Sequence, residues 1–175
     1  MTGPDTMRDD TRNRLHAAIA EKPSAPLEEI AAQAGTTVAD VVHALPGGAA
    51  VCVSGDRFVD VMTDIAGWGE ITFIVNTGDV ILEAKGELPS GKTGRGFFNL
   101  HGKPIAGHLK ADACGMIAFV TRKLFGSDTC SVQMYAHAGH CLFKIYLGRD
   151  AEGRLRPDQI ARFEALRDRL AAEAA

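Results

Sequence analysis

The chain has 175 residues and a formal net charge of −3; 46% of its residues are hydrophobic and 23% are charged. These values are typical of a globular domain whose apolar core is large enough to need neither disulfides nor a structural metal. Broad binding to nucleic acid or to anionic lipid needs an excess of positive charge, which this chain lacks. We therefore expect no nucleic-acid partner.

The N-terminal sequence is polar and mixed in charge, without the apolar run of a signal peptide. No other stretch is long and apolar enough to cross a bilayer, so we expect a cytoplasmic protein with no membrane insertion. The four cysteines form no CxxC pair, and in a reducing compartment we expect free, buried thiols. They are Cys52, Cys114, Cys130 and Cys141.

Residues 1–46 are predicted to form an N-terminal helical segment. Leu15 and Ile19 lie at helical spacing in a first helix, and prolines within residues 23–26 interrupt the chain. Residues 27–45 have the pattern of two short helices around a glycine turn, whose apolar side chains would close a small core between them.

This pair of short helices resembles a DNA-binding helix-turn-helix. A recognition helix needs cations beside the phosphates, but the second helix contains no Arg or Lys. Residues 1–46 hold four basic and seven acidic side chains. A helical cap on the main domain is therefore favoured, and a DNA-binding regulator stays as an alternative.

Residues 47–175 are predicted to form the main α+β domain. An amphipathic helix is expected at residues 56–66, and a final helix begins after Arg156, where Pro157 suits the first turn. Between them, short apolar segments bounded by turn residues predict a meander of antiparallel strands. These segments are residues 70–76, 79–86, 95–100, 104–110, 114–122, 129–135 and 141–147. Strands in the middle with helices at both ends indicate an α+β fold and not alternating βαβ units.

Three segments carry side chains suited to a flat, anionic ligand. Adjacent aromatics in a strand face opposite ways, so Phe97 could face a pocket, and Arg95 could hold a carboxylate through two hydrogen bonds. His108 follows a glycine and could approach a planar ligand or a metal. Lys144 and Arg149 could hold anionic groups. Each also has an ordinary interpretation: an exposed aromatic, a histidine bonded to the backbone, and solvated charges at a strand end.

A second candidate metal site is the run His137, His140 and Cys141. It falls on a predicted hairpin turn, where polar side chains are usually solvated, so metal binding is the less favoured interpretation there.

Several longer strings together resemble the HutX/ChuX family of intracellular haem-utilisation carriers, single-repeat relatives of the HemS/ChuS proteins. They are residues 86–91 (GELPSG), 96–100 (GFFNL), 107–110 (GHLK), 122–129 (RKLFGSDT) and 143–150 (FKIYLGRD). The resemblance implies a large antiparallel sheet flanked by helices, and two chains paired as a homodimer. It also implies a non-enzymatic carrier that holds haem as cargo and passes it to a haem-degrading enzyme.

The resemblance bears on individual residues as well. His108 matches a histidine implicated as an axial ligand of haem iron in some members. Asn76 and Phe97 replace a histidine and a tyrosine that other members use, and neither residue is a good iron ligand. Tyr146, Tyr135 or a cysteine stay open as replacement donors.

Two other functions remain as alternatives to the haem carrier. The chain could degrade haem itself with an external reductant, although it has no GxGxxG or similar reductant site. The other alternative is the DNA-binding regulator described above. We also expect residues 1–46 to be dispensable for haem binding, because no candidate pocket residue lies among them.

Overall fold

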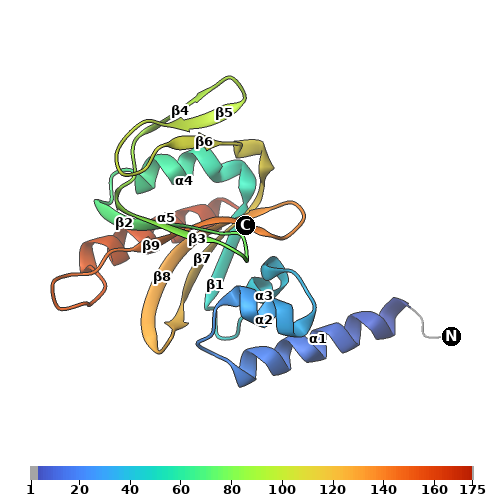
Figure 1. Ribbon diagram of the computed structural model, residues 1–175. Helices are drawn as coiled ribbons and strands as arrows, with labels where there is room; N and C mark the ends of the chain where they lie inside the picture. The colour runs from blue at the N-terminus through green and yellow to red at the C-terminus, as the bar shows by residue number, and fades with distance from the viewer. Residues whose placement is uncertain (1–3, 175) are drawn as a thin grey trace.

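The computed structural model describes residues 4–174, and its centre is a six-stranded antiparallel sheet in the order β1-β7-β8-β9-β2-β3 (Figure 1). Its strands are β1 (Ala50–Ser54), β2 (Glu70–Asn76), β3 (Ile81–Glu87), β7 (Cys114–Leu124), β8 (Ser127–Ala136) and β9 (Cys141–Leu147). A smaller sheet contains β4 (Gly91–Gly94), β5 (Phe97–Leu100) and β6 (Gly107–Leu109). The expected large antiparallel sheet with flanking helices is confirmed.

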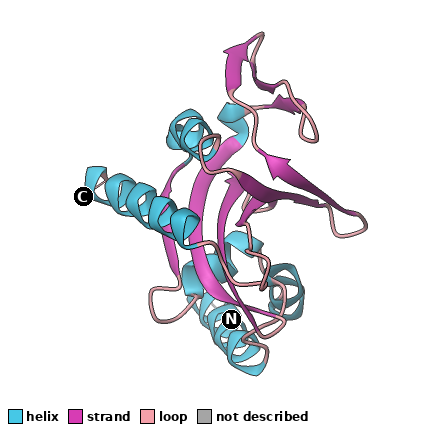
Figure 2. Cartoon of the chain, turned by 90° about the vertical axis from the view of Figure 1, so that its left-hand side faces the viewer, coloured by secondary structure: helices cyan, strands magenta, loops and turns pink. Residues whose placement is uncertain are grey.

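Helices α4 (Phe58–Ile65) and α5 (Pro157–Glu173) cover one face of the main sheet (Figure 2). Strand alternation places Phe143 and Ile145 of β9 on this face, where they join the larger apolar core. The small sheet adds Phe98 and Leu100 to the same core, so it packs over α4 on this side of the molecule.

A buried glutamine fixes the start of α5 to the sheet. Gln159 is fully buried, and its amide nitrogen donates to the carbonyl oxygens of Trp68 and Glu70 at 2.9 and 2.8 Å. Its amide oxygen accepts from the backbone nitrogen of Gly148 at 2.6 Å. Both N–H groups of this buried amide and its oxygen thus have a hydrogen-bond partner, as burial requires.

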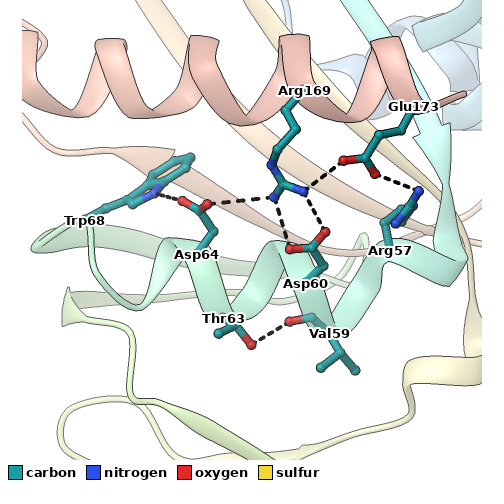
Figure 3. Close-up of polar contacts among 8 residues, drawn as sticks. All are labelled: Arg57, Val59, Asp60, Thr63, Asp64, Trp68, Arg169 and Glu173. Atoms are coloured by element: carbon teal, nitrogen blue, oxygen red, sulfur yellow. Dashed lines mark hydrogen bonds and ion pairs between the residues drawn. The ribbon is translucent and has the colours of Figure 1, made fainter.

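Ion pairs on the molecular surface join α4 to α5 (Figure 3). Arg169 of α5 donates to both carboxylate oxygens of Asp60, at 3.0 and 3.1 Å, and to Glu173 at 3.4 Å. The indole nitrogen of Trp68 donates to Asp64 at 2.7 Å. The ion-paired side chains are more than a third exposed, so each pair contributes at most about 1 kcal/mol.

The N-terminal helices α1 (Pro4–Glu21), α2 (Leu27–Ala34) and α3 (Val38–Ala44) lie on the opposite face of the sheet. Their buried apolar side chains share one cluster with Ala118, Val120 and Tyr135 of the sheet. The expected self-contained helical core is therefore incomplete, because the sheet supplies one of its walls. The boundary at residue 46 stays a prediction, and residues 1–3 lie outside the described range.

The expected helices and seven strand regions are present, with differences in length and number. The segment at residues 104–110 is a strand only over Gly107–Leu109. Strands β1 and β4 were not expected from the sequence. No helix among the described residues is long and apolar enough to cross a membrane.

Candidate functional site

The small sheet carries polar and aromatic side chains on the side that faces away from the core. Asn99 of β5 lies opposite His108 of β6. Phe98 is buried against Phe58 of α4, so the adjacent Phe97 points the other way, as expected from strand alternation. We call this surface the outer patch. It consists of Phe97, Asn99, His101, His108 and Lys110.

Asn99 fixes the hydrogen-bonding state of His108. Its amide nitrogen lies 3.1, 3.1 and 3.2 Å from the carbonyl oxygens of Lys92, Gly94 and Phe97, to which it donates. The amide oxygen therefore faces His108 Nδ1, 2.6 Å away. Because an amide oxygen only accepts, Nδ1 carries a proton, and the lone pair of a neutral ring lies on Nε2. A hydrogen bond donated by the second ring nitrogen is the usual arrangement of a metal-binding histidine.

An aromatic ring, that of Phe97, lies beside this histidine, and two cations lie near the ring. The ring centres of Phe97 and His108 are 6.0 Å apart, and Lys110 Nζ lies 5.9 Å from the centre of the Phe97 ring. Arg95 occupies the exposed turn between β4 and β5 with a φ of 55°. The outer patch and its adjoining turn thus combine a nitrogen donor, a flat apolar surface and two cations.

A cavity of about 360 Å³ lies on the opposite face of the main sheet, between the start of α2 and strands β2, β3 and β9. This volume is at the lower end of the roughly 300–1,000 Å³ of small-molecule sites. Its apolar residues are Ile74, Ile81, Leu124, Phe125, Leu147 and Leu155, with Leu27 at the start of α2. Its cations are Lys85, Arg122, Lys144 and Arg149, and its carboxylates are Glu28 and Glu83. Four cations against two carboxylates make the cavity locally positive in an acidic chain.

Lys144 is the buried cation of the cavity. Its side chain is only 8% exposed, and its Nζ lies 2.6 Å from Glu28 Oε1. Burial works against the charged form, but the attraction of Glu28 and other neighbours outweighs it and raises the pKa of Lys144 above its ordinary value. Glu28 Oε1 is itself buried and, apart from this ion pair, has no polar partner among residues 9–174. At neutral pH, Lys144 is therefore charged and Glu28 is its counter-ion.

The two arginines of the cavity are partly engaged by the backbone. Arg122 Nη2 donates to the carbonyl oxygen of Pro23 at 2.7 Å. Arg149 donates to the carbonyl oxygens of Gly153 and Asp128 at 2.9 and 2.7 Å. Burial lowers the pKa of Arg122, but a guanidinium stays charged in proteins. Each arginine has five N–H groups, so both keep donors for a ligand.

The site residues expected from the sequence fall into two groups. Arg95, Phe97 and His108 lie in or beside the outer patch, whereas Lys144 and Arg149 line the cavity. The small sheet packs over α4 on one side of the main sheet (Figure 1). The strand residues that line the cavity point to the other side of that sheet. One chain therefore does not bring all five residues together.

Sequence reasoning missed Glu28 and Arg122. Glu28 was assigned only to a helical cap, yet Pro26, Leu27 and Glu28 line the cavity. The premise that no pocket residue lies within residues 1–46 is therefore wrong, whereas the dispensability of these residues for haem binding stays a prediction. An acidic residue in the first turn of a helix is an ordinary surface feature, and the partner of Glu28 is distant in sequence, so no local signal identified the pair.

The alternative iron donors differ in how accessible they are. Tyr135 is fully buried, and its hydroxyl donates to Gln133. Burial raises the pKa of Cys141 to about 12, so its thiol stays protonated at neutral pH. Tyr146 lines the cavity, although burial raises the pKa of its phenol against the opposing effect of Lys144. Tyr146 thus lines the cavity, whereas Tyr135 and Cys141 do not.

The histidine-rich turn and the four thiols have ordinary surroundings. His137 is exposed and its Nε2 lies 3.0 Å from the carbonyl oxygen of Asp112. No group of three His, Cys, Asp or Glu side chains within residues 9–174 is arranged to hold a metal ion. All four cysteines are free, as expected, but the expected burial holds only for Cys114 and Cys130, because Cys52 and Cys141 are half-buried.

The helix-turn-helix interpretation conflicts with how α3 is packed. Thr37 caps α3 in a reciprocal capping box with Asp40. The first turn of α3 is covered by the β8–β9 turn, because Ala39 donates its backbone N–H to the carbonyl oxygen of Gly139 at 3.1 Å. A Cβ added at Gly139 would lie 2.8 Å from Thr37 Oγ1. The helix end that a recognition helix inserts into the major groove thus rests on the β8–β9 turn.

The fold is shared with several solved structures. A protein from Agrobacterium tumefaciens has a TM-score of 0.87 and 40% identity, covering 97% of this chain and 98% of its own. The structure of the heme binding protein ChuX has a TM-score of 0.81 and 40% identity, covering 89% and 98%. PhuS from Pseudomonas aeruginosa is 14% identical with a TM-score of 0.71, and this chain matches 46% of its length. At this low identity the match to PhuS concerns the fold alone. This chain has the fold of about half of the longer PhuS chain.

Sequence comparison gives the family. The intracellular heme transport protein HutX of Vibrio cholerae is 33% identical over 150 residues, which are 85% of this chain and 78% of HutX. The family model described as haem utilisation ChuX/HutX matches residues 51–166. This span includes the small sheet with the outer patch and every cavity residue except those of α2 and its approach. The chain therefore belongs to the haem-utilisation ChuX/HutX family.

Proposed function

We propose that this protein binds haem inside the cell and carries it to a haem-degrading enzyme, without being an enzyme itself. The proposal rests on membership of the haem-utilisation family and on relatives named for heme transport and heme binding. Haem needs apolar contact for its ring, cations for its two carboxylates and an axial donor for iron. The described residues include candidates for each requirement.

The observation that carries this proposal is the state of His108. Asn99 holds the proton on Nδ1, which leaves Nε2 as the free donor of an exposed imidazole. Phe97 lies beside it as an apolar surface for a porphyrin ring. We propose that His108 is the axial ligand of haem iron and that Phe97 and Arg95 contact the haem from the same side. Lys144 and Arg149 are proposed as partners of the haem carboxylates.

A homodimer would reconcile the separation of these two groups. In one chain the outer patch and the cavity lie on opposite sides of the main sheet, but two copies can place one copy's outer patch near the other's cavity. Exposed apolar side chains at the cavity rim and on the edge strand β3 support burial by a second copy. They are Ile81, Leu82 and Phe125, which is 77% exposed.

Titration with hemin tests the proposal directly. The parent chain is expected to bind hemin with a histidine-type Soret band and to release it to apomyoglobin. His108→Ala should keep the fold, shift the Soret band and release hemin faster, because iron loses its nitrogen donor. His137→Ala is the matched control, since that histidine lies on an exposed turn outside both candidate surfaces. An unchanged spectrum and transfer rate for His108→Ala would assign the ligand elsewhere.

The haem-degrading alternative makes a different prediction. An enzyme would form an open-chain product with a physiological electron donor at catalytic protein concentration, whereas a carrier would deliver intact haem. Transfer of intact haem to a haem-degrading enzyme, faster than release into solvent, would support the carrier and its proposed recipient.

A further inference from the structure

Residues 23–28 hold the N-terminal helices against the cavity through three polar contacts. Arg122 donates to the carbonyl oxygen of Pro23, and the backbone nitrogen of Phe125 donates to that of Ser24 at 2.8 Å. The third contact is the ion pair of Lys144 with Glu28 at 2.6 Å. Arg122, Phe125 and Lys144 all line the cavity. Residues 23–28 are therefore bound by hydrogen-bond donors of the cavity that an anionic ligand could also use.

Glu28 has the chemistry of such a ligand's anionic group. Its Oε1 atom is buried, lies against the buried ammonium of Lys144 and has no other polar partner among residues 9–174. The other carboxylate of the cavity, Glu83, is exposed on β3 and forms no ion pair within the described residues. One carboxylate of the chain thus occupies the most buried cationic position of a cavity that is otherwise rich in cations.

We infer that Lys144 is a binding position for a ligand carboxylate and that Glu28 occupies this position until the ligand displaces it. Glu28 is then an internal competitor that lowers the affinity for ligands with carboxylates and leaves other ligands unaffected. Displacement also breaks one of the three contacts that hold residues 23–28, so occupancy of the cavity loosens the start of α2. This inference rests on the proposed function, because the carboxylates in question are those of haem.

Glu28→Gln tests the competition. This variant keeps the size of the side chain and removes its charge, so hemin should bind roughly tenfold more tightly, the value of one charge-assisted contact. Hemin dimethyl ester, in which both carboxylates are blocked, should bind the variant and the parent equally. Glu29→Gln is the matched control, because Glu29 is the next residue of α2 and pairs with Lys22 on the surface. It should leave both affinities unchanged.

A second variant keeps the inference testable if Glu28→Gln folds poorly because Lys144 has lost its counter-ion. In the double variant Glu28→Gln/Lys144→Gln the buried pair is neutral and can still form a hydrogen bond. The ratio of the affinities for hemin and for its dimethyl ester should be smaller in this variant than in the parent. Hydrogen exchange of residues 23–28 in the parent should become faster when hemin binds and stay unchanged with the ester.

The outcomes distinguish a failure of the competition by Glu28 from a failure of haem binding itself. A tighter complex of Glu28→Gln with hemin alone, together with the loss of discrimination in the double variant, supports the inference. Equal gains for hemin and its ester, or an unchanged or weaker complex with hemin, overturn it while the proposed function stands. A parent chain that does not bind hemin overturns the proposed function and this inference with it.

Discussion

Replacing Lys144 with methionine removes the buried ammonium and leaves the carboxylate of Glu28 without its partner. Breaking a buried ion pair on one side generally costs about 3–5 kcal/mol of unfolding free energy. The Glu28 side chain is 23% exposed, so its carboxylate can turn partly towards water. We therefore expect Lys144→Met to lower the unfolding free energy by about 2 kcal/mol, below that range.

The loss of unfolding free energy in Lys144→Met should come from the isolated charge of Glu28 and not from the loss of the lysine side chain. The double variant Lys144→Met/Glu28→Leu removes both charges and should be within about 1 kcal/mol of the parent. The pair of Lys22 and Glu29 has the same 2.6 Å distance, but its side chains are 39% and 50% exposed. Lys22→Met should consequently cost less than about 0.5 kcal/mol.

Urea denaturation followed by circular dichroism gives the unfolding free energies of all four proteins. The slopes of the linear extrapolations should agree, since only then do midpoint differences measure stability alone. If Lys144→Met costs no more than Lys22→Met, the buried pair contributes no more than a surface pair. In that case the description of Glu28 as the counter-ion of Lys144 would be wrong.

Three further results are expected. Phe97→Tyr places a phenol beside His108 and should add a tyrosinate component to the spectrum of bound hemin; an unchanged spectrum would place Phe97 away from the iron. Asp60→Asn should lower the unfolding free energy by about 0.5 kcal/mol at neutral pH. The hydrogen bond from Arg169 lowers the pKa of Asp60, so this contribution is present above the ordinary carboxyl pKa and is lost as the pH falls through the lowered value. Parent and Asp60→Asn should therefore converge in strong acid, and a constant difference would contradict the assignment. Light scattering should give a homodimer, and a monomer across the micromolar range would exclude it.

The sequence predicted those features that depend on local periodicity. In β9, strand alternation separates Phe143 and Ile145 from Lys144 and Tyr146, and the structure places the first pair in the core and the second pair at the cavity. The same rule separated Phe97 from the buried Phe98. A strand has only two faces, so its pattern identifies the buried side without knowledge of the neighbouring strand.

Features that depend on distant pairing could not be predicted in this way. Strand β1 follows the turn residues that end the helical segment, and its partner β7 lies about half the main domain away in sequence. The pair of Glu28 with Lys144 has the same origin, since no local pattern joins α2 to β9. The sequence also gave no reason to place His108 and Lys144 on opposite sides of the main sheet. That separation follows from the packing of a whole three-stranded sheet over α4.

The position of Glu28 has a consequence for release of the cargo. If a ligand carboxylate and Glu28 compete for Lys144, the free energy of the contact between Glu28 and Lys144 is subtracted from the free energy of ligand binding. Coupling of this kind is reciprocal, so anything that holds the N-terminal helices more firmly against the sheet must weaken ligand binding by the same factor. A recipient protein that contacts both the N-terminal helices and the sheet in their docked arrangement would thereby promote release, without touching the cavity. Release by this protein then needs no second conformation of the main sheet, because the competing carboxylate is already in its own chain.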